Sequence, residues 1–240
     1  MERLHLQLVI YIDGEKMSFD SPHAAANHGI RMVYQELDLF PHLTVAENIC
    51  QGNIPKNKAG MVDWKEMERV SKELLKLIKV DINVNERMDR LSIAQQQIAA
   101  IARALNGNCK FILLDEPTSA LPKKDVENLF AIVRNLKKEG ISVVFISHKL
   151  DEMMDITDRI TILNNGKKVA TVQTSDINEE LLAEMVVGKT IKNKYPKVRY
   201  EKGETLLRFE HITLKNHLND ISFELKRGEV LGIVGLLGAG

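Results

Sequence analysis

The sequence predicts an α/β fold built on a parallel sheet, and three observations lead to this prediction. Two apolar runs, residues 111–114 and 142–147, are too short for helices and suit buried strands. A helical pattern over about residues 124–138 separates them and ends at Gly140. A strand, a helix and a second strand in succession are typical of parallel sheets, whose strands are joined by helical crossovers.

The first third of the chain predicts a hairpin and a short strand. Apolar runs at residues 8–12 and 15–19 flank Asp13 and Gly14. An Asp-Gly pair between two such runs favours a tight hairpin turn, because Gly accepts a positive φ. Residues 30–34 are a further strand candidate.

The middle third predicts a helical subdomain over about residues 42–106. Thr44 with Glu47, and Ser92 with Gln95, have the spacing of capping boxes, in which two side chains satisfy free N–H groups at a helix start. Between the two boxes, residues 64–80 carry apolar side chains at helical spacing.

The last part predicts a hairpin, a helix and the start of a new unit. Residues 160–163 and 169–172 flank an Asn-Asn-Gly turn, and a helix over about 177–187 ends at Gly188. Residues 189–202 carry six basic side chains and one acid. A solvated linker is favoured there over a basic patch for lipid or nucleic acid. Three later runs predict strands of a second unit: residues 206–209, 221–225 and 230–234.

The composition limits the classes of function. The chain has 240 residues, of which 44% are hydrophobic and 28% are charged, and this excludes disordered and fibrous proteins. The 33 Lys and Arg residues balance 33 Asp and Glu residues, so no overall field attracts nucleic acid. Cys50 and Cys109 are too few for a zinc cluster and suit a reducing compartment. No apolar run reaches the ~18 residues of a membrane span, so a membrane role is expected to be peripheral.

Polar residues follow the predicted strands at the sheet edge where α/β folds bind ligands. Asp115 and Glu116 end the first strand, and these carboxylates suit Mg²⁺ binding and the activation of water. His148 follows the second strand and suits a hydrogen bond to a γ-phosphate. Gln35 follows residues 30–34 and suits a metal or a water. Acids that only cap the next element, and a structural His148, are the alternatives.

Four short motifs stand in a fixed order along the chain. They are Val-Tyr-Gln-Glu at 33–36, Leu-Ser-Ile-Ala-Gln-Gln-Gln at 91–97, Leu-Asp-Glu-Pro-Thr-Ser-Ala-Leu at 114–121 and Ile-Ser-His at 146–148. This set resembles the Q-loop, signature, Walker B/D-loop and H-loop of ABC-transporter ATPases. The Ala-Gln-Gln-Gln form is similar to the ATPase subunits of ribose, galactose and xylose importers, which carry two nucleotide-binding domains in one chain. The resemblance covers nearly the whole chain.

The resemblance implies a role for each motif residue. Gln35 and Asp115 are expected to bind Mg²⁺, the latter through water, and Gln35 also to signal to the membrane subunits. Glu116 is expected to be the catalytic carboxylate, and His148 to contact the γ-phosphate. Ser92 and Gln95 are expected to reach ATP held by the opposing domain. The start of a capped helix suits an anion, which supports this expectation. A capping role alone is the other interpretation of this pair, and it is compatible with the first.

The sequence departs from the family pattern in the signature and after the Walker B motif. Ile93 and Ala94 stand where the general signature has two glycines, so the backbone is expected to approach phosphate less closely. Pro122 stands where many members have an aspartate, which puts the communication through the D-loop in question.

The phosphate-binding P-loop, Gly-x-x-x-x-Gly-Lys-[Ser/Thr] after a strand, is expected before the Q-loop. The 34 residues before Gln35 contain no match. Residues 183–190 fit a relaxed form of the pattern, but they follow a predicted helix for which Gly188 suits the C-cap. The glycine-rich segment 230–240 resembles the opening of a second P-loop, which makes three glycines nucleotide-binding candidates: Gly235, Gly238 and Gly240.

The sequence therefore predicts a P-loop NTPase of the ABC ATPase type, in part. Residues 1–188 are expected to be a first nucleotide-binding domain that lacks its Walker A motif, residues 189–203 a linker, and residues 204–240 the β-rich start of a second domain. The expected function is that of a fragment of the ATP-hydrolysing subunit of a monosaccharide importer. By itself this chain is expected to be a poor or inactive ATPase.

The same resemblance implies ligands, partners and location. ATP and Mg²⁺ are the expected ligands. The expected partners are membrane-spanning permease subunits, a sugar-binding protein and a second nucleotide-binding domain, at the cytoplasmic face of the cell membrane, with no nucleic acid. Two alternatives are a non-catalytic interaction fragment and the ATPase of a nucleoside or other small-solute importer.

Overall fold

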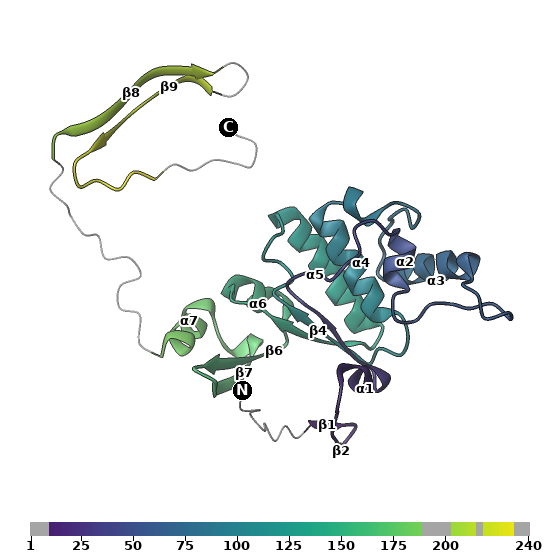
Figure 1. Cartoon of the computed structure of the whole chain (residues 1–240). Coiled ribbons are helices and arrows are strands. Elements are labelled where there is room, and N and C mark those ends of the chain that lie inside the picture. Colours follow the sequence, from purple (N-terminus) through teal and green to yellow (C-terminus); the bar gives the residue numbers. More distant parts are fainter. Residues whose placement is uncertain (1–9, 189–202, 215–217, 233–240) are drawn as a thin grey trace, which may run out of the picture. The chain divides into compact units, whose positions relative to one another are not determined.

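The computed structural model describes residues 10–188, 203–214 and 218–232. The chain divides into two compact units, Met1–Lys189 and Thr190–Gly240 (Figure 1). Each unit is described by itself below.

The centre of the first unit is a three-stranded parallel sheet in the order β3 (Ile30–Val33), β4 (Phe111–Asp115), β5 (Ser142–Ile146). Helix α5 (Lys123–Lys138) makes the crossover from β4 to β5. The strand, helix and strand predicted from the sequence are thus confirmed, and so is their parallel arrangement. Because all three strands run in the same direction, their carboxyl ends meet at one edge of the sheet.

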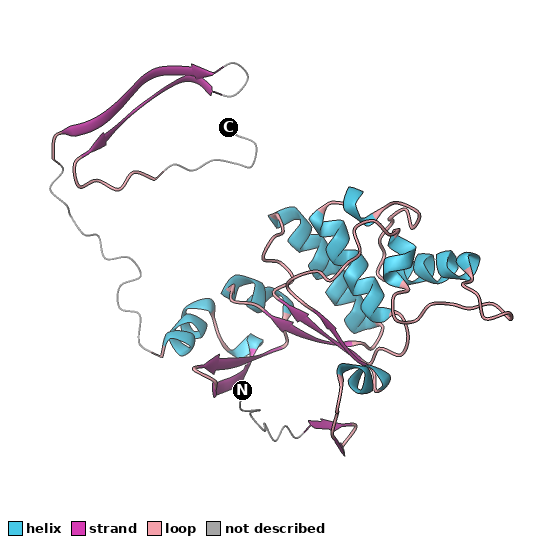
Figure 2. Ribbon diagram, in the orientation of Figure 1, coloured by secondary structure: helices cyan, strands magenta, loops and turns pink. Residues whose placement is uncertain are grey.

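One face of the sheet packs against helices and forms the main core. Figure 2 shows α4 (Ile93–Leu105) and α5 along this sheet. Side chains alternate between the two faces of a strand. Accordingly Ile112 and Leu114 are fully buried in the core, whereas Val144 and Ile146 are 45% and 42% exposed. The rings of Phe130 on α5 and Phe145 on β5 meet edge to face, with centroids 5.9 Å apart.

The middle of the chain is helical, as predicted. It contains α2 (Val45–Ile49), α3 (Trp64–Leu77), the 3₁₀ helix η1 (Met88–Arg90) and α4. Both predicted capping boxes are present with reciprocal hydrogen bonds, at the starts of α2 and α4. Within the described residues, no helix is long and apolar enough to cross a membrane.

Two antiparallel hairpins confirm the turn predictions. Strands β1 (Ile10–Ile12) and β2 (Glu15–Met17) pair across Asp13 and Gly14, whose φ angles are 53° and 84°. Strands β6 (Arg159–Asn164) and β7 (Lys167–Gln173) pair across an Asn-Gly turn, whose φ angles are 48° and 73°. These positive φ angles are why Asp-Gly and Asn-Gly are favoured in tight hairpins.

The first unit ends with the 3₁₀ helix η2 (Thr174–Asp176) and α7 (Glu179–Val187). Gly188 caps α7 in the left-handed conformation, at φ 72°. The relaxed P-loop pattern at 183–190 therefore begins inside a helix, as expected. Two short helices were not predicted, α1 (Pro22–Asn27) and α6 (Leu150–Ile156), since six or seven residues are too few for a periodic signal.

The second unit contains a long antiparallel hairpin of β8 (Thr205–Leu214) and β9 (Leu218–Lys226). The predicted strands at 206–209 and 221–225 lie in it and are confirmed. Residues 230–232 are not in a strand, and no described strand pairs with them, so that prediction is not met there. Residues 233–240 lie outside the described part, and with them Gly235, Gly238 and Gly240; of the predicted linker only Gly203 is described.

Candidate active site

The carboxyl edge of the central sheet brings together four residues singled out in the sequence. Val33 lies beside Leu114, so Gln35, two residues further on, follows β3 at the edge where β4 ends. Asp115 is the last residue of β4 and Glu116 follows it. His148 comes two residues after the end of β5.

Glu116 and His148 are in direct contact at this edge. His148 Nδ1 lies 3.0 Å from Glu116 Oε1, a hydrogen bond that joins the ends of two neighbouring strands. The Glu116 side chain is 28% exposed and that of His148 is 67% exposed, so a water or a ligand can reach both. The arrangement places a carboxylate beside an imidazole, a pair suited to holding a water molecule and moving its proton.

The backbone at Glu116 has an unusual conformation. Its φ is 43°, in the left-handed region that a residue with a side chain enters at a cost in free energy. The Glu116 N–H donates to the carbonyl of Ile146 at 2.9 Å, which holds this bend against β5. Such strain persists only where the surrounding structure imposes it, and it is common at functional sites.

Asp115 and Gln35 offer oxygen ligands next to this pair. Asp115 is partly buried and Gln35 is exposed. No group of three or more His, Cys, Asp or Glu side chains suited to a metal occurs among the described residues. Mg²⁺ does not require such a cage, because it keeps several waters and is held by one or two carboxylates together with substrate phosphates. The two oxygen donors fit this kind of binding.

Ser92 and Gln95 begin α4 and are not in hydrogen-bonding contact with the sheet edge in the described structure. The Ser92 Oγ accepts from the Gln95 N–H at 3.3 Å, and the Gln95 Oε1 accepts from the Ser92 N–H at 3.0 Å. Ser92 is exposed, as is the neighbouring Ile93 at 55%. The helix start is thus capped and at the same time open to an outside ligand.

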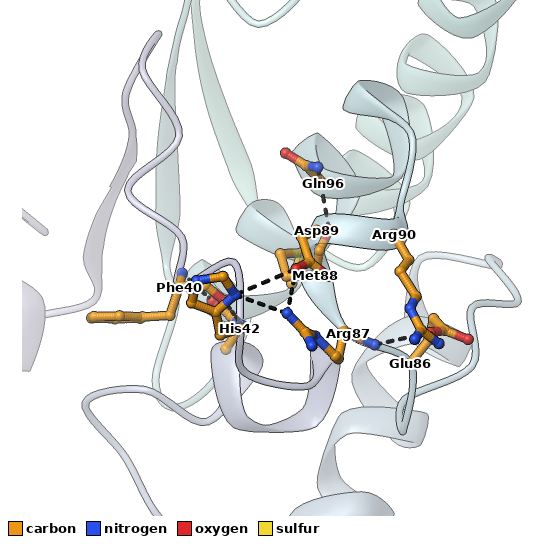
Figure 3. Close-up of polar contacts among 9 residues, drawn as sticks. Phe40, His42, Glu86, Arg87, Met88, Asp89, Arg90 and Gln96 are labelled. Atoms are coloured by element: carbon orange, nitrogen blue, oxygen red, sulfur yellow. Dashed lines mark hydrogen bonds and ion pairs between the residues drawn. The ribbon is translucent and has the colours of Figure 1, made fainter.

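The segment before α4 is held by a polar cluster (Figure 3). Arg87 binds both Asp89 and His42, at 2.5 and 2.8 Å, and so ties this segment to the one that follows Gln35. Gln96 on α4 donates to the carbonyl of Met88 at 3.2 Å. Burial acts to raise the pKa of Asp89, but the contacts with Arg87 and His42 outweigh it and lower this pKa. The cluster fixes the backbone that leads into the start of α4.

Sequence reasoning assigned no role to a set of polar residues that are bonded to one another next to this edge, although two of them stand in the quoted motifs. These are Thr118 after β4, Ser147 and Lys149 after β5, and Glu152 in α6. A buried acid four residues after His148 gives no signal in a single sequence, since an acid in a short helix is usually exposed.

The sequence profile of the ABC transporter family matches residues 8–119. A putative ribose/galactose/methyl galactoside import ATP-binding protein of Geobacillus kaustophilus is 40% identical over 96% of this chain and 46% of its own length. The ribose import ATP-binding protein RbsA of the same organism is 38% identical over 96% of this chain and 47% of its own. The galactose/methyl galactoside import ATP-binding protein MglA of Clostridium perfringens is 38% identical over 96% and 45%. The chain thus spans about half the length of the curated relatives it matches.

Solved structures resemble the chain as well. The ATP-binding cassette MJ0796, in a post-hydrolysis dimer with ADP and Pi, is 30% identical with a TM-score of 0.58, over 69% of this chain and 73% of that one. The cassette MJ1267 of an ABC transporter is 24% identical with a TM-score of 0.64, over 74% of each chain, and shows the fold alone.

Proposed function

The chain belongs to the ATP-binding cassettes of ABC transporters, and on this premise we propose that it is part of the ATP-hydrolysing subunit of a monosaccharide importer. The fold class predicted from the sequence, a P-loop NTPase of the ABC ATPase type, is confirmed by the family match and the solved cassettes. The sugar class is supported by relatives named for ribose and galactose import, which align over 96% of the chain.

The contact between Glu116 and His148 carries the proposed hydrolytic role. A carboxylate at the end of β4 can orient a water and accept its proton, and the imidazole 3.0 Å away keeps the carboxylate in place and can bond a γ-phosphate oxygen. Gln35 and, through water, Asp115 would hold Mg²⁺, which supplies positive charge to the phosphate oxygens. Catalysis then consists of positioning and electrostatic stabilisation, as is usual for phosphoryl transfer.

The organisation and partners of the whole subunit are part of the same proposal. Residues 1–188 belong to a first nucleotide-binding domain and residues 204–240 to the start of a second. Ser92 and Gln95 face ATP on an opposing domain, and their exposed, capped helix start supports this. Permease subunits, a sugar-binding protein and a place at the cytoplasmic face of the membrane follow from an import function. A nucleotide contact by Gly235, Gly238 and Gly240 remains a prediction.

The test is sugar uptake by source cells that carry Glu116→Gln in the native gene. We expect uptake of labelled ribose or galactose to be lost at an unchanged protein level, because the amide cannot accept a proton from water. The matched control is Glu127→Gln, which makes the same chemical change at an exposed residue of α5. Unchanged sugar uptake in the Glu116→Gln cells would contradict the proposal. Loss of nucleoside uptake instead would assign the subunit to the other substrate class.

A further inference from the structure

A buried carboxylate is bonded to the loops that carry the candidate active site. Glu152 is in the first turn of α6, and only 6% of its surface is exposed. Its Oε2 accepts hydrogen bonds from the hydroxyls of Thr118, at 2.6 Å, and Ser147, at 3.3 Å. Its Oε1 accepts from the Lys149 ammonium at 2.9 Å. One side chain therefore binds three residues from two different loops.

These three residues flank the two members of the active pair. Thr118 comes two residues after Glu116, and Ser147 and Lys149 stand on either side of His148. Further bonds close the network. The Lys149 ammonium donates to the Thr118 carbonyl at 3.2 Å, and the Lys149 N–H donates to the Ser147 hydroxyl at 3.0 Å. The loop after β4 and the loop after β5 are thus tied to each other by bonds that do not include Glu116 or His148.

A network of this kind is better suited to fixing geometry than to adding stability. A buried ion pair recovers in attraction about what it loses in hydration, so Glu152 and Lys149 contribute little net free energy of folding. A fully bonded buried network does, however, favour a single arrangement of the groups attached to it. Thr118 is 1% exposed, so it cannot exchange its bond to Glu152 for one to bulk water.

We propose that Glu152 is a positioning residue that holds His148 against Glu116 by clamping the loops that carry them. This role rests on the proposed hydrolytic function. Glu152 itself touches neither of the two active residues through a described hydrogen bond. It acts through Thr118 on one loop and through Ser147 and Lys149 on the other, and it sets the 3.0 Å contact between the Glu116 and His148 side chains.

The experiment measures the coupling between Glu116 and His148 by NMR of the whole chain with ¹³C-labelled histidine. Glu116→Gln removes the carboxylate next to the imidazole and so moves the His148 Cε1–Hε1 signal. That signal is assigned as the one missing in His148→Gln. In a Thr118→Val or Glu152→Gln background, we expect the displacement caused by Glu116→Gln to fall to less than half of its size in the parent.

Matched variants separate the clamp from a general loss of structure. Thr118→Ser keeps the hydroxyl, so in this background Glu116→Gln should displace the His148 signal fully. The nearly isosteric Thr118→Val lacks the hydroxyl, and the displacement should be smaller. Asp151→Asn changes an exposed acid in the same turn of α6 and should also keep it. If Glu152→Gln does not fold, the Thr118 pair decides.

Two results would overturn the clamp. One is that Glu116→Gln displaces the His148 signal in the Thr118→Val background as far as in the parent. The other is that Thr118→Ser and Asp151→Asn reduce this displacement as much as Thr118→Val does. The readout needs no ATP turnover. The two proposals can therefore fail separately. If the NMR displacement behaves as expected but Glu116→Gln does not change sugar uptake, the hydrolytic function is contradicted and the clamp stands.

Discussion

Glu116 and His148 are 32 residues apart in the sequence, yet His148 Nδ1 lies 3.0 Å from Glu116 Oε1. The contact arises because β4 and β5 are parallel neighbours, with Asp115 beside Ile146, so both loops leave the sheet at the same edge. The two side chains of the proposed hydrolytic pair are thereby brought together by neighbouring parallel strands.

Removal of the imidazole should reduce turnover. We expect His148→Ala to lower ATP hydrolysis by the native subunit by about 10²–10³-fold, the usual effect of deleting one well-placed hydrogen-bond donor. The measurement is phosphate release under saturating ATP. His23→Ala, which removes an exposed imidazole on α1, is the control and should hydrolyse ATP at the parent rate. Equal rates for His148→Ala and the parent would show that the imidazole takes no part.

The strained backbone at Glu116 predicts an unusual response to glycine. Glu116→Gly and Glu116→Ala both remove the carboxylate, but only glycine adopts a φ of 43° without a steric cost. We expect the glycine variant to be more stable than the alanine variant by about 1–2 kcal/mol in urea unfolding. The same pair of changes at Glu127, inside α5, should give the opposite order, because glycine weakens a helix. An alanine variant as stable as the glycine variant would mean that the bend is not strained.

The two capping boxes allow a structural role to be separated from a functional one. Thr44→Ala and Ser92→Ala each delete a side-chain acceptor at a helix start and should each lower the free energy of unfolding by about 1 kcal/mol. Only Ser92→Ala is expected to weaken ATP-dependent uptake as well, because Ser92 is exposed at the helix start that we propose faces the nucleotide. If both variants impair uptake to the same degree, Ser92 acts only as a cap.

The two cysteines should make stability fall at alkaline pH. Burial raises the pKa of the Cys50 thiol, and a hydrogen bond with Ser71 opposes this only in part. Burial likewise raises the pKa of Cys109, against the charge of Arg31. Above the ordinary thiol pKa of 9.0, the unfolded chain loses these protons while the folded chain keeps them. Unfolding therefore becomes easier as the pH rises.

The measurement is urea unfolding under reducing conditions at about pH 8 and about pH 10. The parent should lose more free energy of unfolding between these values than the double variant Cys50→Ala, Cys109→Ala. Other alkaline titrations affect both proteins equally, so the difference reports the thiols. An identical loss in the two proteins would contradict the shift.

Local signals in the sequence were sufficient for most elements of the first unit. The parallel strands, the capping boxes and the hairpin turns depend on neighbouring residues, and each is found where it was predicted. The predictions failed where a local signal was weak or a partner was needed. Helices α1 and α6 are shorter than two turns, and residues 230–232 have no described strand to pair with.

The candidate site likewise contains residues that a local sequence signal reveals and residues that it does not. Asp115, Glu116 and His148 could be found because polar residues at the ends of apolar strands stand out in the sequence. Glu152 could not be found in this way, because its partner Thr118 lies 34 residues earlier.

By itself, then, the sequence determined the type of most elements, the parallel sheet and the edge at which the chemistry is placed, since hydrophobic periodicity and turn residues act over a few neighbouring positions. Only the tertiary structure decided which side chains meet at that edge. The Glu116–His148 contact, the left-handed backbone at Glu116 and the burial of Glu152 are set by packing between distant segments, and no local pattern records that packing.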